Sequence, residues 1–444
     1  MDLRLSRTVA IVGAALGACA LGATLGACES DGSAVPGPAE DASAAPDTGD
    51  LGGPDARYEH VYPAPHAPFP RVDVRIAERA KVQAHQKVVT IAFEGDAVKA
   101  RVEAFTDVLG ATTFWGDTTR EYCTDTGPDG CVAQTTVLSH VTLTGPPPAS
   151  LSPQGVEDFL QQLITSGKVP SPADDVVYMF LFPPSVTLGE PGFESCIAFD
   201  GYHGLLKAVV PAPTPDPGDA GDAGDAGNAS DAGNASDAGV TSAKAVYAVQ
   251  AECAGGEAEA TVGVAHELIE TATDPDGFGF NVADPAWSTF FYPEVGDLCD
   301  YEPTQTVYGF TVQSGWSNVA ARAGKNPCAP DPPGDVYFNA APAVPRVSLK
   351  VGESTTVAVM PFSVAPTADW QLDALDLSSL YGDKAALQLT LDRKQVHNGL
   401  PVTLTVKLLR VPDPLPTGNR AAVLALSSML GKTQRFWPML VVPK

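Results

Sequence analysis

The chain has 444 residues, of which 44% are hydrophobic, and this length is enough for two ordinary domains joined by linkers. Its formal net charge is -26 at pH 7. So acidic a chain has no electrostatic attraction for nucleic acid or for an anionic membrane surface, and a cation or a basic polymer is the favoured partner.

The first 28 residues have the composition of an export signal. Arg4 and Arg7 precede an apolar stretch that is marginal for a membrane-spanning helix and is interrupted by glycines. The tetrapeptide LGAC occurs twice, ending at Cys19 and Cys28, and it resembles the lipobox of bacterial lipoproteins. That resemblance implies cleavage before the cysteine and diacylglycerol on its sulfur.

Cys28 is the favoured lipidation site because polar sequence follows it, whereas Cys19 is followed by more apolar residues. An ordinary cleaved signal and an uncleaved anchor are the alternatives. The sequence therefore predicts a lipoprotein of the bacterial cell envelope, facing the periplasm or the exterior. Its only contact with the membrane would be the N-terminal lipid.

A disordered tether is expected over residues 29–70, where Pro, Gly, Ala, Ser and Asp dominate, most clearly up to about residue 58. Strands and helices then alternate. The β-branched run 88–94 precedes a helical pattern, and the segment 152–167 begins with a Ser-Pro helix start and ends at a glycine. The apolar run 175–183 is typical of a buried central strand, so we expect an α/β domain over 71–334.

Two further segments complete this organisation. Residues 212–243 repeat Asp, Ala, Gly and Asn, with almost no side chains able to enter a core, and a disordered insertion within the α/β domain is expected. The aspartate spacing does not match a calcium-binding EF-hand loop. Residues 335–444 contain short alternating runs separated by turn residues, which predicts an immunoglobulin-like β-sandwich.

Six cysteines follow the signal, and an even number in an exported chain indicates disulfide bonds. Fifteen pairings are possible in principle for six cysteines. The simplest follows their order along the chain: Cys123 with Cys131, Cys196 with Cys253, and Cys299 with Cys328.

The segment VAHELIETATDP, residues 264–275, carries the pattern H-E-x-x-E. On a helix over 259–273, His266 and Glu270 would lie one turn apart on the same face, with Glu267 displaced by about 100°. This is the geometry of a zincin helix, in which two side chains bind zinc and the intermediate glutamate polarises a water held by the metal. A carboxylate in place of the usual second histidine lets other divalent cations compete with zinc. An ion pair, or exposure to water, is the alternative.

Additional donors are expected close to this helix. Glu294 is the preferred third metal ligand, with Asp297 or Asp274 as second choices, and Cys299 could fix the segment that carries Glu294 and Asp297. His203, in DGYHG, could be a ligand, a transition-state donor or a structural hydrogen-bonding residue.

The ordered set CIAFDGYHG, VYAV, AHELIETATDP, Trp287, EVGDLCD and WSN followed by Cys328 resembles the phosphate-induced or EXORDIUM-type family. The resemblance covers about residues 85–330 and implies a secreted α/β domain with a zincin-like helix, in a family whose plant members are linked to cell-wall growth. Carried over by position, the site residues are His266, Glu267, Glu270 and Glu294. Ala265 stands where the family pattern often has Ser, and the insertion is also a departure.

These observations predict a lipid-anchored zinc metallopeptidase-like protein that acts on a peptide or a cell-surface polymer. His266, Glu270, Glu294 and Asp297 would be the metal-ligand candidates, while Glu267, as general base, and His203 would be catalytic. One alternative is a non-catalytic cell-surface binding protein braced by a metal or by a polar network, and another is a structural lipoprotein without metal. Serine-hydrolase and phosphate-loop motifs are absent from the sequence.

Overall fold

The structure is a computed structural model that describes residues 58–75, 79–124, 130–211, 240–253, 255–378, 384–415 and 420–444. The expected signal peptide, the expected lipidation at Cys28 and most of the expected tether lie outside these residues. Within the described ranges, none of the helices combines the length and apolar character needed to cross a membrane.

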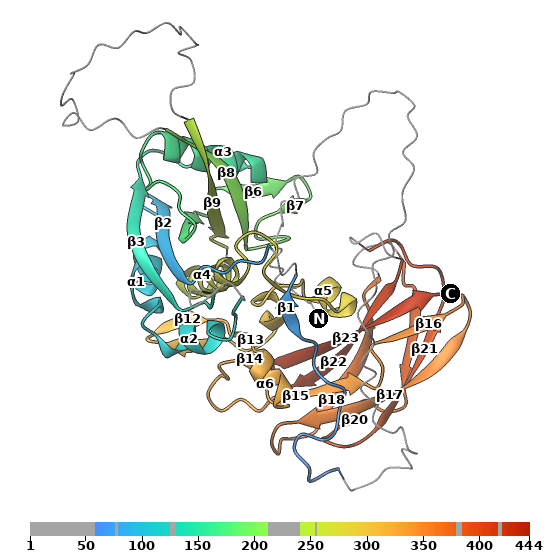
Figure 1. The fold of residues 1–444 in the computed structure, drawn as a ribbon. Helices are drawn as coiled ribbons and strands as arrows, with labels where there is room; N and C mark the ends of the chain where they lie inside the picture. The colour runs from blue at the N-terminus through green and yellow to red at the C-terminus, as the bar shows by residue number, and fades with distance from the viewer. Residues whose placement is uncertain are drawn as a thin grey trace, which may run out of the picture.

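The first half of the chain is built on a five-stranded sheet with the order β3-β2-β5-β9-β8 (Figure 1). Its strands are β2 (His85–Phe93), β3 (Gln134–Leu143), β5 (Val176–Phe182), β8 (Gly201–Pro211) and β9 (Val240–Ala251). β3, β2, β5 and β9 are parallel, and β8 runs antiparallel along the edge of β9. The α/β alternation expected from the sequence is present.

Helices cover both faces of this sheet, as the fully buried strand β5 requires. The helices of this half of the chain are α1 (Lys99–Leu109), α2 (Thr113–Thr119), α3 (Pro153–Thr165), α4 (Gly256–Thr273), α5 (Pro285–Phe290) and α6 (Asn318–Arg322). Met179 of β5 belongs to the core shared with α1 and α4, whereas Phe180 belongs to the core shared with α3. The Ser-Pro helix start is confirmed, because the Ser152 hydroxyl accepts a hydrogen bond from the Gly155 amide.

Short strands and one 3-10 helix complete the α/β half. They are β1 (Val72–Val74), β4 (Ser150–Leu151), β6 (Thr187–Glu190), β7 (Phe193–Glu194), β10 (Phe280–Val282), η1 (Asp297–Cys299), β11 (Gln305–Val307), β12 (Phe310–Val312), β13 (Gly315–Trp316) and β14 (Cys328–Ala329). All three expected disulfide pairings are confirmed: Cys123–Cys131, Cys196–Cys253 and Cys299–Cys328.

The C-terminal part is made of strands, as expected. One sheet has the order β15-β17-β21-β19 and the other β16-β23-β22-β18-β20, and β15 contacts both β22 and β23. The strands are β15 (Phe338–Pro342), β16 (Arg346–Leu349), β17 (Ser354–Ser363), β18 (Trp370–Asp376), β19 (Leu387–Leu391), β20 (Gln395–Val396), β21 (Val402–Leu408), β22 (Ala422–Leu430) and β23 (Thr433–Pro443). The immunoglobulin-like assignment stays a prediction.

Two expected boundaries are wrong in detail. Residues 58–70, assigned to the tether, are packed on the C-terminal part: the Asn398 side chain accepts from the Ala64 amide and donates to the carbonyl of Val61. His66 also stacks on Phe362 at 3.6 Å between ring centres. The insertion ends before residue 243, because β9 begins at Val240 and pairs with β8 from Val240 to Gln250.

An aromatic and ionic junction joins the two halves. The Trp287 ring lies 5.6 Å from that of Trp316 and 5.4 Å from that of Trp437. Arg435 of β23, only 1% exposed, donates from Nε to both carboxylate oxygens of Glu302 at 3.0 Å. The segment that follows η1 is therefore held by the C-terminal part.

Candidate metal centre

Helix α4 carries the H-E-x-x-E residues on its buried C-terminal half. The helix spans Gly256–Thr273, three residues longer at its start than the sequence predicts, and its first turn carries acidic side chains that suit the helix dipole. His266, Glu267 and Glu270 have side chains no more than 2% exposed. Because three polar side chains are buried here, they need partners to offset the loss of hydration.

His203 reaches the same place from strand β8. Its register partner in β9 is Ala248, which lies in the core on the α4 side of the sheet. Gly201, two residues earlier, allows the close approach of α4: a Cβ at this position would lie 2.6 Å from Glu267 Oε1 and 2.8 Å from the Val249 carbonyl oxygen. The glycine and histidine of DGYHG thus serve one contact between β8 and α4.

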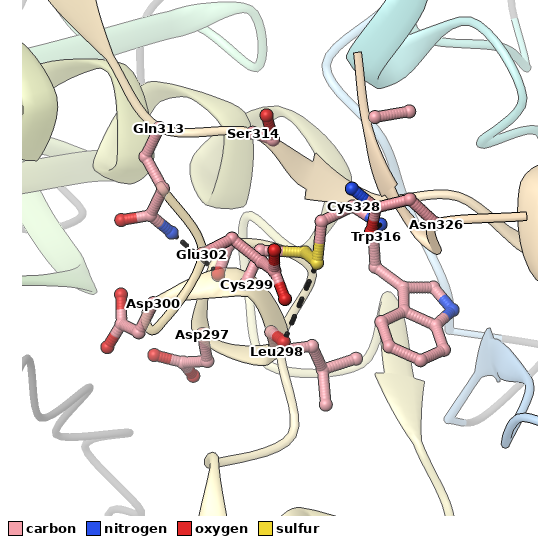
Figure 2. Close-up of a disulfide and its surroundings, with 12 residues drawn as sticks. Asp297, Leu298, Cys299, Asp300, Glu302, Gln313, Ser314, Trp316, Asn326 and Cys328 are labelled. Atoms are coloured by element: carbon pink, nitrogen blue, oxygen red, sulfur yellow. Dashed lines mark hydrogen bonds between the residues drawn. A yellow bond between two sulfur atoms is a disulfide. The ribbon is translucent and has the colours of Figure 1, made fainter. Parts of the chain in front are cut away.

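The segment 293–300 brings the remaining carboxylates. The Val282 amide donates to the Pro293 carbonyl, and the Trp316 amide donates to the Val295 carbonyl. The Cys299–Cys328 disulfide closes the other end of this segment, and Figure 2 shows Asp297 of η1 and Asp300, which follows η1, extending away from the sulfur atoms. Main-chain hydrogen bonds and a covalent bond therefore fix the loop that faces α4.

One group of donors surrounds His266. His266 Nε2 lies 3.2 Å from Glu270 Oε1 and 3.7 Å from Asp297 Oδ1. With bonds of about 2.1 Å, two ligands at a tetrahedral ion are about 3.4 Å apart. The spacing of His266, Glu270 and Asp297 fits that requirement.

A second group surrounds His203. His203 Nδ1 lies 3.6 Å from Glu267 Oε2, 3.6 Å from Glu270 Oε2 and 3.8 Å from Glu294 Oε2. The two oxygens of Glu270 therefore face different histidines. The structure places Asp297 beside His266, and it places Glu294, the preferred third ligand from sequence, beside His203.

Many donor atoms of these two groups are buried and have no hydrogen-bond partner among the described residues. They are His203 Nδ1, His266 Nε2, Glu267 Oε2, Glu270 Oε2, both carboxylate oxygens of Glu294 and both of Asp297. Buried polar atoms are nearly always satisfied, and those that are not call for a specific explanation. A divalent cation would satisfy them through the nitrogen and oxygen ligands that it prefers, so the residues present fit a metal.

The protonation equilibria of the metal-free protein reflect the same crowding of charge. Burial alone would lower the pKa of His266, but the carboxylates of Glu270 and Asp300 raise it well above its usual value. Burial raises the pKa of Glu294 and of Asp297 well above the usual range, and the carboxylate of Glu270 adds to both effects. Without a metal, the cluster compensates its charge by taking up protons.

Asp300 and Gln313 belong to the site but were not singled out from the sequence. Asp300 Oδ1 lies 3.6 Å from His266 Nδ1, where a carboxylate can orient the ring so that Nε2 faces a metal. Gln313 Nε2 lies 3.2 Å from the same His266 nitrogen and donates to the Gly296 carbonyl at 2.7 Å. The sequence signal that could have identified Asp300 is its position three residues after Asp297, because this spacing puts both carboxylates on the same side of a helical turn.

Asp274, a second-choice ligand, is engaged elsewhere. It is the C-cap of α4, and its Oδ1 accepts a hydrogen bond from the Gly279 amide at 2.6 Å. Its other oxygen, Oδ2, accepts from the Asn281 side-chain amide. These bonds hold the turn after the helix, so the structure gives Asp274 a structural role.

A cavity of about 200 Å³ opens beside His266. His266, Asp300 and Gln313 line it together with Asp200, Gln250 and Glu259. A small cation or part of a larger molecule can therefore reach one side of the donor cluster. The acidic lining favours species that carry positive charge.

The sequence was compared with protein-family models and with curated proteins, and neither comparison finds a match for this chain.

Proposed function

We propose that this protein is an exported, lipid-anchored, divalent-metal-dependent hydrolase that acts on peptides. The observation that supports this proposal is the set of buried nitrogen and oxygen donors that have no hydrogen-bond partner among the described residues and are spaced as metal ligands are. His266, Glu270 and Asp297 would hold the catalytic ion, zinc being the first candidate and another divalent cation the alternative. The ion would supply Lewis acidity for attack of water on a peptide carbonyl.

Glu267 is the protein group proposed to move the proton. Its Oε2 is buried, has no hydrogen-bond partner among the described residues, and lies one residue after His266 on the same helix. The carboxylate would accept a proton from the attacking water and return it to the leaving amine, so that each cycle leaves Glu267 ionised. Peptides are proposed as the substrate class because the H-E-x-x-E helix resembles that of zincins, within a resemblance to the EXORDIUM-type family.

The decisive experiment compares wild type with Glu267→Gln in the hydrolysis of an unfolded, fluorescently labelled protein. We expect EDTA to abolish wild-type hydrolysis, and we expect the variant to lose activity by about 10²- to 10⁴-fold. Metal content and melting temperature should be unchanged, because Gln keeps the shape of Glu. Glu190→Gln, at an exposed position, is the matched control. Full activity in Glu267→Gln would contradict the proposal.

A non-catalytic binding protein, in which metal only braces the fold, is the second candidate. It is favoured by the near-complete burial of the donor side chains. The most exposed of them, His203, is only 6% exposed; the others are His266, Glu267, Glu270, Glu294 and Asp297. In that case Glu267→Gln would leave function intact, whereas His266→Ala would lower the melting temperature.

A further inference from the structure

We infer that the site holds two divalent cations, which share Glu270 as a bridging carboxylate. The second ion would be held by His203 Nδ1, Glu270 Oε2 and Glu294. This inference rests on the proposed function for the first ion, at His266, Glu270 and Asp297, and adds a second metal site to it.

The orientation of Glu270 is the first step. Its Oε1 lies 3.2 Å from His266 Nε2, and its Oε2 lies 3.6 Å from His203 Nδ1. A carboxylate whose two oxygens face two different imidazoles can bridge two ions at the separation of about 3.5–4 Å found in two-metal hydrolytic sites. The Asp297 amide donates to Oε1 at 3.1 Å and holds the carboxylate in this orientation.

The donors around His203 form a separate group with the spacing of ligands. His203 Nδ1 is 3.8 Å from Glu294 Oε2, and each of the two side chains is at least nine-tenths buried. Both oxygens of Glu294 lack a hydrogen-bond partner among the described residues, as does His203 Nδ1. His203 and His266 belong to two separate donor groups that share Glu270, so an ion at His266 does not also satisfy His203 Nδ1.

Glu294 is preferred to Glu267 as a ligand of the second ion. Among the described residues, both buried oxygens of Glu294 lack a hydrogen-bond partner, whereas for Glu267 only Oε2 does. Three protein ligands leave a position open at a catalytic ion. Glu267 Oε2 lies 3.6 Å from His203 Nδ1 and keeps the proton-accepting role proposed above.

The charge of the donor cluster also favours two divalent ions. Five carboxyl groups meet in the cluster: Glu267, Glu270, Glu294, Asp297 and Asp300. One divalent ion offsets two of their five formal negative charges, and two ions offset four. Since buried charge is costly unless it is compensated, a second ion offsets charge that a single ion would leave uncompensated.

The test is the number of metal ions bound to the full exported chain. The protein is purified without chelator, stripped with EDTA, reloaded with excess Zn²⁺, desalted and analysed by elemental mass spectrometry. We expect two Zn²⁺ per chain in wild type, one in His203→Ala and in Glu294→Gln, and none in Glu270→Gln. His397→Ala, at a half-buried position, and Glu190→Gln, at an exposed position, control for zinc on side chains outside the cluster and should keep two.

Reloading with Mn²⁺ tests the bridge itself. Two Mn²⁺ ions that share a carboxylate should give an exchange-coupled electron paramagnetic resonance spectrum, and His203→Ala should convert it to that of a single ion. One Zn²⁺ per chain in wild type, or an uncoupled Mn²⁺ spectrum, would overturn the two-ion site.

The two proposals fail separately. If wild type binds one Zn²⁺ that His266→Ala removes, and EDTA-sensitive hydrolysis persists, the second site is refuted while the proposed function stands. If the protein binds two ions but Glu267→Gln is fully active, the proposed proton transfer is refuted while the two-ion site stands. If Glu267→Gln binds only one ion, Glu267 is a ligand, and both the proton role and the chosen ligand set are wrong.

Discussion

His266 and Glu270 lie one helical turn apart on α4, and His266 Nε2 is 3.2 Å from Glu270 Oε1. Neither side chain is more than 2% exposed. An imidazole and a carboxylate held this close inside the protein can form an ion pair or bind a common cation. The surrounding donor atoms, which have no hydrogen-bond partner in the part of the chain that the structure describes, favour the cation.

Removal of the metal should destabilise the protein. Ligand that binds only the folded state adds about 2.7 kcal/mol of stability at a free concentration of 100 times its dissociation constant. We expect EDTA to lower the melting temperature by several degrees and Zn²⁺ to restore it. Differential scanning calorimetry measures this shift. Glu270→Gln should melt at the same temperature with and without EDTA.

Substitution of Gly296 by alanine should weaken metal binding. The added Cβ would lie 2.9 Å from both Glu270 Oε1 and His266 Nδ1, so these two side chains would have to move. We expect the Zn²⁺ dissociation constant to rise at least tenfold, as measured by competition with a chromophoric chelator. Gly116→Ala in α2, where a Cβ meets nothing within 4 Å, should bind Zn²⁺ like wild type.

Loss of the Cys299–Cys328 disulfide should affect both stability and the site. The bond closes a separation of 29 residues, for which chain entropy predicts a contribution of about 3.5 kcal/mol. Cys299→Ser combined with Cys328→Ser should therefore lower the unfolding free energy and weaken Zn²⁺ binding, because Asp297 lies within η1.

The matched control is removal of Cys123–Cys131, which spans 8 residues and should cost about 2.5 kcal/mol. It should leave Zn²⁺ affinity unchanged. Equal losses of Zn²⁺ affinity in the two double variants would contradict a local role for Cys299–Cys328.

Arg435→Met should destabilise the junction between the two halves of the chain. Its guanidinium contacts Glu302 and Asp335, and removing one partner of a buried pair costs about 3–5 kcal/mol because the other charge stays buried. Urea unfolding measures the loss. Adding Glu302→Gln should recover part of it, and Arg346→Met, at an exposed position of β16, should change stability little.

Glu252 should make stability depend on pH. Burial raises the pKa of this carboxyl to about 8, and Asp96 contributes to the shift. The folded state thus keeps a proton that the unfolded state releases near pH 4.5, so this contribution is complete below pH 4.5 and is lost as the pH rises through 8. In Glu252→Gln the decline in melting temperature from pH 5 to pH 8 should be smaller, whereas Glu94→Gln should follow wild type.

The sequence by itself determined the local features of this protein. A spacing of four residues puts His266 and Glu270 on one helical face wherever the helix lies, because the α-helical repeat is fixed. The buried strand β5 follows from its continuous apolar run, and the Ser152 cap from the residues that begin α3. The disulfide pairs followed the order of the cysteines along the chain.

Only the tertiary structure decided how the donors are divided between the two histidines. His203 comes from β8, which lies at α4 because β8 pairs antiparallel with β9, and no local spacing encodes that pairing. The fold of segment 293–300 likewise places Asp297 beside His266 and Glu294 beside His203. Such distances depend on strand order and on close approach at Gly201 and Gly296, which are properties of packing between segments far apart in the chain.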